Sequence, residues 1–147
     1  MIIGIDPGGT KPHALAIYKS GDLVKMFKSS DMIEIEESIK VADKVFIESQ
    51  YFGGNPSTVI KLAHATGMLM GLCELILVPY EMVYPTTWMS TFGITTRRPK
   101  ELSAYKWKKK HYQDIIDKAA EVSEITVADE DYGAAILIGL YGVNNDR

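Results

Sequence analysis

The chain has 147 residues, enough for one domain with a substantial hydrophobic core. Hydrophobic residues make up 46% of it and charged residues 24%, which excludes the disordered and collagen-like classes. No apolar run reaches the roughly 18 residues of a membrane span, and the single cysteine, Cys73, argues against a disulfide framework and favours a reducing cytoplasm. Because the net charge is −3, contacts with phosphate groups would depend on local clusters of basic residues.

Strand and helix signals alternate along the chain. Short apolar runs predict strands at residues 1–6, 13–18, 23–28, 44–48 and 75–78, with 82–84 as a further edge element. Capping residues and helical periodicity predict helices over residues 31–39, 57–73, from Pro85 onward, 103–122 and 128–141. Gly67 and Gly71 are expected to let the second helix pack closely against a neighbour. The order predicts a mixed α/β fold that opens with an antiparallel hairpin and continues with crossovers.

The first strand ends in an acid at a tight turn. Asp6 closes the apolar run, and Pro7 ends the strand because it has no N–H for the β-ladder. Gly8 and Gly9 let the backbone turn sharply and let a charged ligand come close. The alternative is that Asp6 only initiates the turn.

Two further acidic sites lie where apolar structure meets a loop. Glu48 ends the strand at 44–48, and Asp129, Glu130 and Asp131 open the last helix. If the first and fourth strands are neighbours, Asp6 and Glu48 lie side by side, and a helix across that edge adds a third acid. The alternatives are an ion pair of Glu48 with a lysine and a helix cap at Asp129.

Clustered carboxylates of this kind predict a divalent metal site. Three or four of them would repel strongly unless cations occupied the site. Oxygen ligands suit Mg²⁺ or Mn²⁺, and two such ions about 4 Å apart can activate water for attack on a phosphodiester. The three histidines are scattered, so their spacing does not indicate zinc.

A basic segment follows in the second half of the chain. Tyr105 and Trp107 are interleaved among its cations, a pattern that suits a track for nucleic-acid phosphates. The alternative is a solvated helix face. The candidate DNA-binding residues of this segment are Arg97, Arg98, Lys100, Lys106, Lys108, Lys109 and Lys110.

Several motifs carry a family resemblance. Residues 4–8, Gly-Ile-Asp-Pro-Gly, resemble the opening signature of RuvC-type Holliday junction resolvases, which belong to the ribonuclease-H-like nuclease superfamily. Residues 45–51 resemble the family's second signature, a strand that ends in Glu with an aromatic shortly after it. Residues 83–88 and 92–94 resemble the segment that follows in bacterial and phage members. The resemblance runs in order over nearly the whole chain.

The resemblance implies a ribonuclease-H-like α/β fold, with a mixed central sheet flanked by helices, as a single nuclease domain over residues 1–147. It implies a Mg²⁺-dependent crossover junction endodeoxyribonuclease that resolves four-way and related branched DNA. A homodimer is expected because a four-way junction has two-fold symmetry. Asp6, Glu48 and an acid from 129–131 would hold two Mg²⁺ ions, and Tyr51 or Phe52 would stack on bases of the junction.

The sequence departs from the family at its last motif. The family has an acid or His followed by an Asp-Ala step, and residues 129–135 contain no Asp-Ala. One register aligns Asp129 with the family's first acid and places Tyr132 at the position of its second acid. The other register aligns Asp131 with the first acid and places Ala134 at the position of the second. Ideal helix geometry favours Asp131 facing inward and Asp129 as the cap, but Asp129, Glu130 and Asp131 all remain candidates.

Two other functions fit parts of this pattern. A site with only Asp6 and Glu48 intact would suit a non-catalytic junction-binding protein of the same fold. Residues 4–11 also resemble the first phosphate loop of sugar kinases with the actin-like ATPase fold. Such kinases need a second domain and a second glycine-rich loop, for which 147 residues leave no room.

Overall fold

The computed structural model describes residues 1–49 and 54–146. Its centre is a five-stranded mixed sheet in the order β3-β2-β1-β4-β5. The first three strands are antiparallel, whereas β4 and β5 run parallel to β1. The strands are β1 (Ile2–Asp6), β2 (His13–Lys19), β3 (Asp22–Ser29), β4 (Lys44–Glu48) and β5 (Tyr80–Val83). This confirms the predicted mixed α/β fold.

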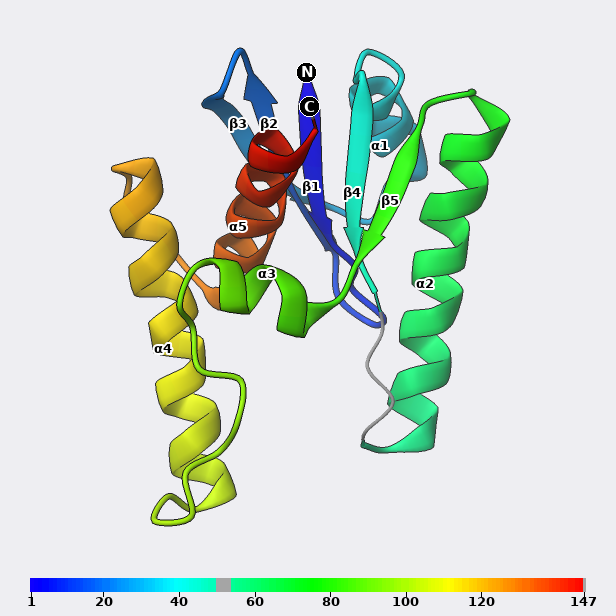
Figure 1. Cartoon of the computed structure of the whole chain (residues 1–147). Helices are drawn as coiled ribbons and strands as arrows, with labels where there is room; N and C mark the ends of the chain where they lie inside the picture. The colour runs from blue at the N-terminus through cyan, green and yellow to red at the C-terminus, as the bar shows by residue number, and fades with distance from the viewer. Residues whose placement is uncertain (50–53, 147) are drawn as a thin grey trace.

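Helices cover both faces of the sheet (Figure 1). One face is covered by α1 (Met32–Ile39) and α2 (Pro56–Leu75), and the other by α5 (Glu130–Asn145). Helices α3 (Pro85–Thr91) and α4 (Ala104–Ser123) pack against α5. Within the described residues, no helix is long and apolar enough to cross a bilayer.

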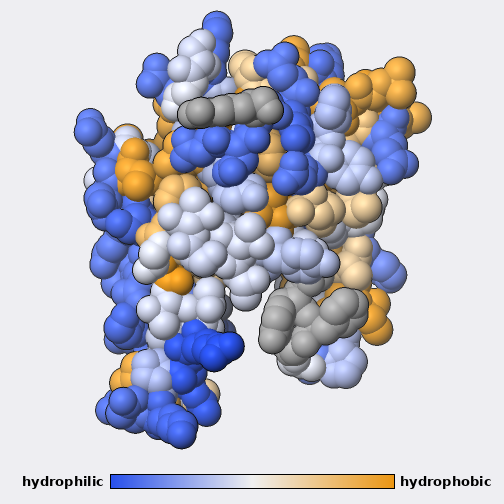
Figure 2. All heavy atoms as spheres, in the orientation of Figure 1, coloured by the Kyte–Doolittle hydropathy of each residue, from blue (hydrophilic) through white to orange (hydrophobic). Residues whose placement is uncertain are grey.

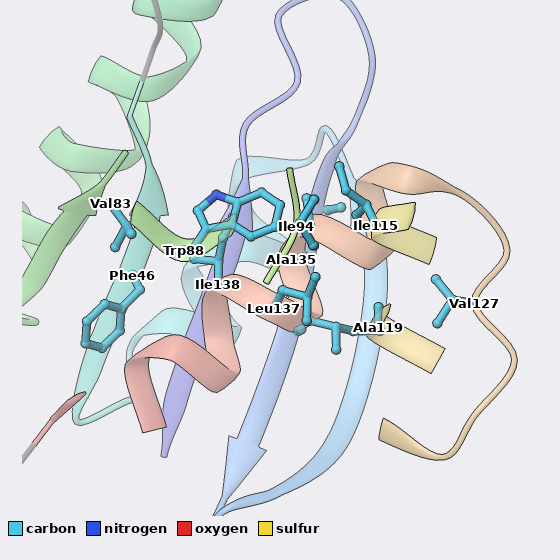
Figure 3. Close-up of a cluster of buried hydrophobic side chains, with 14 of the residues drawn as sticks. Phe46, Val83, Trp88, Ile94, Ile115, Ala119, Val127, Ala135, Leu137 and Ile138 are labelled. Carbon is cyan, nitrogen blue, oxygen red and sulfur yellow. The ribbon is translucent and has the colours of Figure 1, made fainter. Parts of the chain in front are cut away.

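Side-chain alternation along the strands builds two cores. In β2, Leu15 and Ile17 point toward α1 and α2, while Ala14 and Ala16 point toward α5. The core on the α5 side includes the fully buried Trp88 of α3, which Figure 3 shows beside Ile138. Both faces of β1, β2 and β4 are covered. The C-terminal ends of β1 and β4 and the N-terminal end of the antiparallel β2 therefore have fixed positions at one edge of the sheet.

Strand β1 and helix α5 approach each other so closely that they leave no room for a side chain at Gly4. A Cβ atom on Gly4 would overlap the backbone of Gly139 and Ala135. The small residues of α5 therefore allow this helix to lie directly on the centre of the sheet and place its N-terminus beside the end of β1.

We expect Gly4→Ala to lower the free energy of unfolding by about 3 kcal/mol, because overpacking against backbone cannot be relieved by a rotamer change. Urea denaturation monitored by circular dichroism measures this loss. A change below about 1 kcal/mol, the size of an ordinary substitution, would show that β1 and α5 are not in direct backbone contact.

Two predictions about the segment 57–78 are wrong. Residues 75–78 are not a strand: α2 continues to Leu75, the chain turns at Ile76 and Leu77, and the edge strand β5 follows at Tyr80–Val83. A short apolar run cannot by itself distinguish a strand from the end of a buried helix. Gly67 and Gly71 do not permit close packing within the chain, because both are exposed and a Cβ atom on either would meet open space.

Candidate active site

The two acids predicted at strand ends lie side by side. Because β1 pairs with β4 in parallel, with Ile5 opposite Ile47, Asp6 and Glu48 follow at the same edge of the sheet. Their carboxyl groups are in hydrogen-bond contact with each other. Trp88 of α3 donates a hydrogen bond from its indole Nε1 to Glu48 Oε1 at 3.0 Å, which orients the Glu48 carboxylate.

Burial dominates the electrostatics of this pair. Burial, with further contributions from the charges of Glu48 and Asp131, raises the pKa of Asp6 well above its usual range. Burial likewise raises the pKa of Glu48 to about 7, against hydrogen bonds from Trp88 and Asp6 that lower it. The pair therefore resists carrying two negative charges unless a cation is close by.

The third acid beside this pair is Asp131. It lies in the first turn of α5, is 7% exposed, and contributes its charge to the raised pKa of Asp6. Asp129 has a different place as the N-cap, where its Oδ1 accepts a hydrogen bond from the Tyr132 N–H at 3.1 Å. The structure thus places Asp131 inward and Asp129 at the cap.

Two lysines hold Asp131. Lys11 of the glycine turn pairs with its Oδ1, and the Lys28 ammonium of β3 lies 2.9 Å from its Oδ2 and 2.7 Å from Asp129 Oδ2. Burial alone would raise the pKa of Asp131, but the hydrogen bonds from Lys11 and Lys28 outweigh it and lower that pKa. In this arrangement no three Asp, Glu, His or Cys side chains of residues 1–49 and 54–146 are grouped closely enough to hold a metal ion.

The acids line a cavity of about 530 Å³, which we call the acid cavity. Thr58, Lys61 and Leu62 of α2 line it on one side. His111 and Tyr112 of α4 line it on the other. Figure 2 shows the surface hollowed beside the projecting end of α4, one of the two helices that contribute these residues.

The predicted basic segment lies on and before the exposed first half of α4. Lys108 shares a helix face with the cavity residue Tyr112, and its ammonium lies 5.4 Å from the Tyr112 ring centroid. Lys110 pairs with Asp114 at 2.5 Å and is partly neutralised. The exposed basic residues are Arg97, Arg98, Lys100, Lys106, Lys108, Lys109 and Lys110. The predicted base-stacking residues Tyr51 and Phe52 lie outside the described part of the chain.

Sequence reasoning missed several residues of the site. For Lys28 a signal existed, because it pairs with Ala14 across β2 and β3, and Ala14 faces α5. A lysine on that inner face needs an acidic partner. Trp88 and Lys61 carried no comparable signal, since only the packing of α3 and α2 brings them to the cavity.

The fold is the ribonuclease-H-like α/β fold, as comparison with solved structures shows. Thermus thermophilus RuvC in complex with a Holliday junction substrate has a TM-score of 0.65 and 13% identity, covering 97% of this chain and 92% of that chain. A fowlpox virus resolvase in complex with Holliday junction DNA has a TM-score of 0.50 and 20% identity, covering 98% and 99%. The yeast mitochondrial Holliday junction resolvase has a TM-score of 0.51 and 13% identity, covering 95% and 75%.

The sequence itself matches no family model and no curated protein. At identities of 13 to 20% the structural likeness establishes the fold. The predicted fold class is therefore confirmed, while the chemistry of the site has to be argued from its own residues.

Proposed function

We propose that this chain is a crossover junction endodeoxyribonuclease, which resolves four-way and related branched DNA by metal-dependent hydrolysis of phosphodiester bonds. The observation that carries the proposal is the pair Asp6 and Glu48 at the floor of a cavity between two projecting helices. Support comes from the solved structures of the same fold, two of which contain Holliday junction DNA.

The donor set of the acid cavity fits Mg²⁺, for which Mn²⁺ would substitute. Asp6, Glu48 and Asp131 offer hard carboxylate oxygens. Burial raises the pKa of Asp6 and of Glu48, and a bound cation would favour their charged forms. These three residues would hold two ions per site. When bound, the metal supplies charge neutralisation at the phosphate and an activated water.

The chain's own residues prepare the site for this chemistry. Trp88 keeps the Glu48 carboxylate turned toward Asp6. Lys28 holds Asp131 from the side of β3, which leaves the cavity side of Asp131 to Lys11. We propose that Lys11 gives up Asp131 when metal binds and contacts the DNA phosphate. Attack of water on the phosphorus, with the 3′ oxygen as the leaving group, would leave a 5′-phosphate and a 3′-hydroxyl end.

One observation favours a second candidate, a junction-binding protein without nuclease activity. Asp131 is neutralised by two lysines, and the described residues contain no preassembled group of three metal ligands. If the lysines retained Asp131 permanently, Asp6 and Glu48 alone would bind metal weakly.

Incubation of an end-labelled four-way junction with the protein separates the two candidates. We expect symmetric nicks with Mg²⁺ or Mn²⁺ and none with EDTA, whereas linear duplex of the same sequence stays uncut. Binding of the junction without nicks at any Mg²⁺ or Mn²⁺ concentration would identify the non-catalytic protein.

The lysine run of α4 is proposed to contact the phosphates of a junction arm. We expect the Gln triple variant of Lys108, Lys109 and Lys110 to bind junctions more weakly. Its slope of log K against log salt should fall by about one unit for each phosphate that these lysines neutralise in the wild type. Electrophoretic mobility shifts at several salt concentrations measure the slope.

A triple variant of the same charge change, Lys19→Gln with Lys25→Gln and Lys40→Gln, is the control, because these exposed lysines lie on β2, β3 and the end of α1. Equal slopes for the two triple variants would show that the α4 run is only a solvated face.

We also propose a homodimer, formed through the outer face of α2. This face contains Ile60, Gly67, Gly71 and Leu75, and Leu77 follows it in the next turn. Leu75 is 80% exposed and Leu77 is 88% exposed, and Figure 2 shows hydrophobic residues gathered at the upper right. A second copy of the same helix is a suitable partner, since a two-fold interface joins identical patches, and glycines allow close approach of helices.

The double variant Leu75→Lys, Leu77→Lys is expected to sediment as a monomer at concentrations where the wild type is a dimer, because like charges facing each other across an interface cost several kcal/mol. Analytical ultracentrifugation measures this. Ile33→Lys is the matched control, since Ile33 is 72% exposed on α1. A dimer that persists in the double variant would exclude this face.

We propose the cytoplasm as the compartment of this activity. Cys73 is a buried free thiol, and burial raises its pKa to about 11, which keeps it protonated and unreactive. The fold thus uses its single cysteine as a core residue, as suits a reducing compartment.

A further inference from the structure

A second cavity of about 350 Å³ lies beside the acid cavity, and we call it the loop cavity. The glycine turn after β1 separates the two, since Gly9, Thr10 and Lys11 line both of them. Lys61 of α2 also borders both cavities. The loop cavity is completed by residues that include Ser30 and His64.

The two cavities have opposite charge. The acid cavity is lined by four acids. The described residues that line the loop cavity include no acid, but they do include Lys11 and Lys61. Neither Lys61 nor His64 makes an ion pair with any residue in 1–49 or 54–146. Lys11 is already paired with Asp131, so among the described residues Lys61 is the unpaired lysine that would attract an anion to the loop cavity.

Hydrogen-bond donors complete the loop cavity. The hydroxyls of Thr10 and Ser30 and the imidazole of His64 line it together with the lysines. The turn packs closely against α2, because a Cβ atom on Gly9 would lie 3.2 Å from the Leu62 backbone nitrogen. The donors of the turn therefore lie close to those of α2.

We propose that the loop cavity binds the DNA phosphate adjacent to the scissile phosphate on the cleaved strand. The proposal rests on the nuclease function proposed above. A phosphodiester is the anion that fits, because a strand whose scissile phosphate enters the acid cavity has its next phosphate close by, and the two cavities share Lys11 and Lys61 along their common border. Charge-assisted hydrogen bonds from lysine are the usual contacts for such a group.

The test uses junctions with one uncharged methylphosphonate linkage, placed in turn at each position flanking the cleavage site. Binding is measured without divalent metal for the wild type and for the double variant Lys61→Gln, His64→Gln. On the unmodified junction we expect the double variant to bind about tenfold more weakly and to lose about 0.9 of the salt slope, the value for one phosphate contact. On the junction modified next to the scissile phosphate, variant and wild type should bind equally.

Lys61→Arg keeps the charge and should bind as the wild type does, and Lys19→Gln serves as the matched control on the far end of β2. Thermal melting verifies that all variants are folded. This proposal alone would be overturned if the double variant bound every modified junction more weakly than the wild type by the same factor, or if it bound the unmodified junction as tightly as the wild type. Failure of the folded wild type to bind or cut any junction would overturn the nuclease function as well.

Discussion

Asp6→Asn and Glu48→Gln are each expected to abolish cleavage of a four-way junction and to leave binding of the junction intact. Both side chains line the acid cavity and are in contact with each other, whereas the α4 lysines proposed to contact a junction arm do not line this cavity. Loss of an outer-shell partner of a metal ligand costs about 10–100-fold, so loss of a ligand should cost at least about 100-fold. Single-turnover cleavage and mobility shifts measure the two properties separately.

A stability readout distinguishes lost chemistry from a lost fold. We expect Mg²⁺ to raise the melting temperature of the wild type, since a ligand at 100 times its Kd adds about 2.7 kcal/mol of stability, and to raise that of either variant much less. Glu81→Gln on β5 is the control, because Glu81 is exposed and pairs with Lys44. Cleavage by either site variant at near wild-type rate would refute the assignment of the site.

Asp131→Asn and Asp129→Asn are expected to differ strongly, although the two residues are neighbours and both contact Lys28. Asp131 is buried beside Asp6, so its Asn variant should lose at least about 100-fold in cleavage rate, as expected for a ligand rather than its outer-shell partner. Asp129 caps α5, and Asn is also a good N-cap, so its variant should lose less than about 1 kcal/mol of stability and keep most activity.

Each of these variants serves as the control for the other, because the charge change and the helix are the same. Equal loss of activity in both variants would mean that activity depends on the contacts of these acids with the lysines, and not on Asp131 as a metal ligand. Normal cleavage by both would point to Glu130, which also lines the acid cavity, as the third acid.

Local sequence by itself predicted β1 to β4 and the acids at the ends of β1 and β4. The apolar runs that end at Asp6 and Glu48 are short and bounded by turn residues or polar loops, and such runs predict buried strands whose last residues meet at one edge when the strands are parallel. The small residues of α5 suit its buried position, since a Cβ atom on Gly4 of β1 would overlap the α5 backbone. The strands depend on hydrogen bonds between neighbouring strands, and the pattern of apolar residues along the sequence indicates which segments form such strands.

Only the tertiary structure placed one of the three C-terminal acids inward and showed which residues bind it. In the sequence Asp129, Glu130 and Asp131 all remain candidates, although helix geometry favours Asp131 facing inward, and in the structure Asp131 is buried while Asp129 is the N-cap. Lys11 and Lys28 are distant from α5 along the chain, so no local pattern showed that Asp131 is the acid they both bind. The end of α2 was predicted as a strand for a related reason. An apolar run indicates that a segment is buried, but it does not show whether the backbone is helical or extended. Packing against the rest of the fold selects between the two.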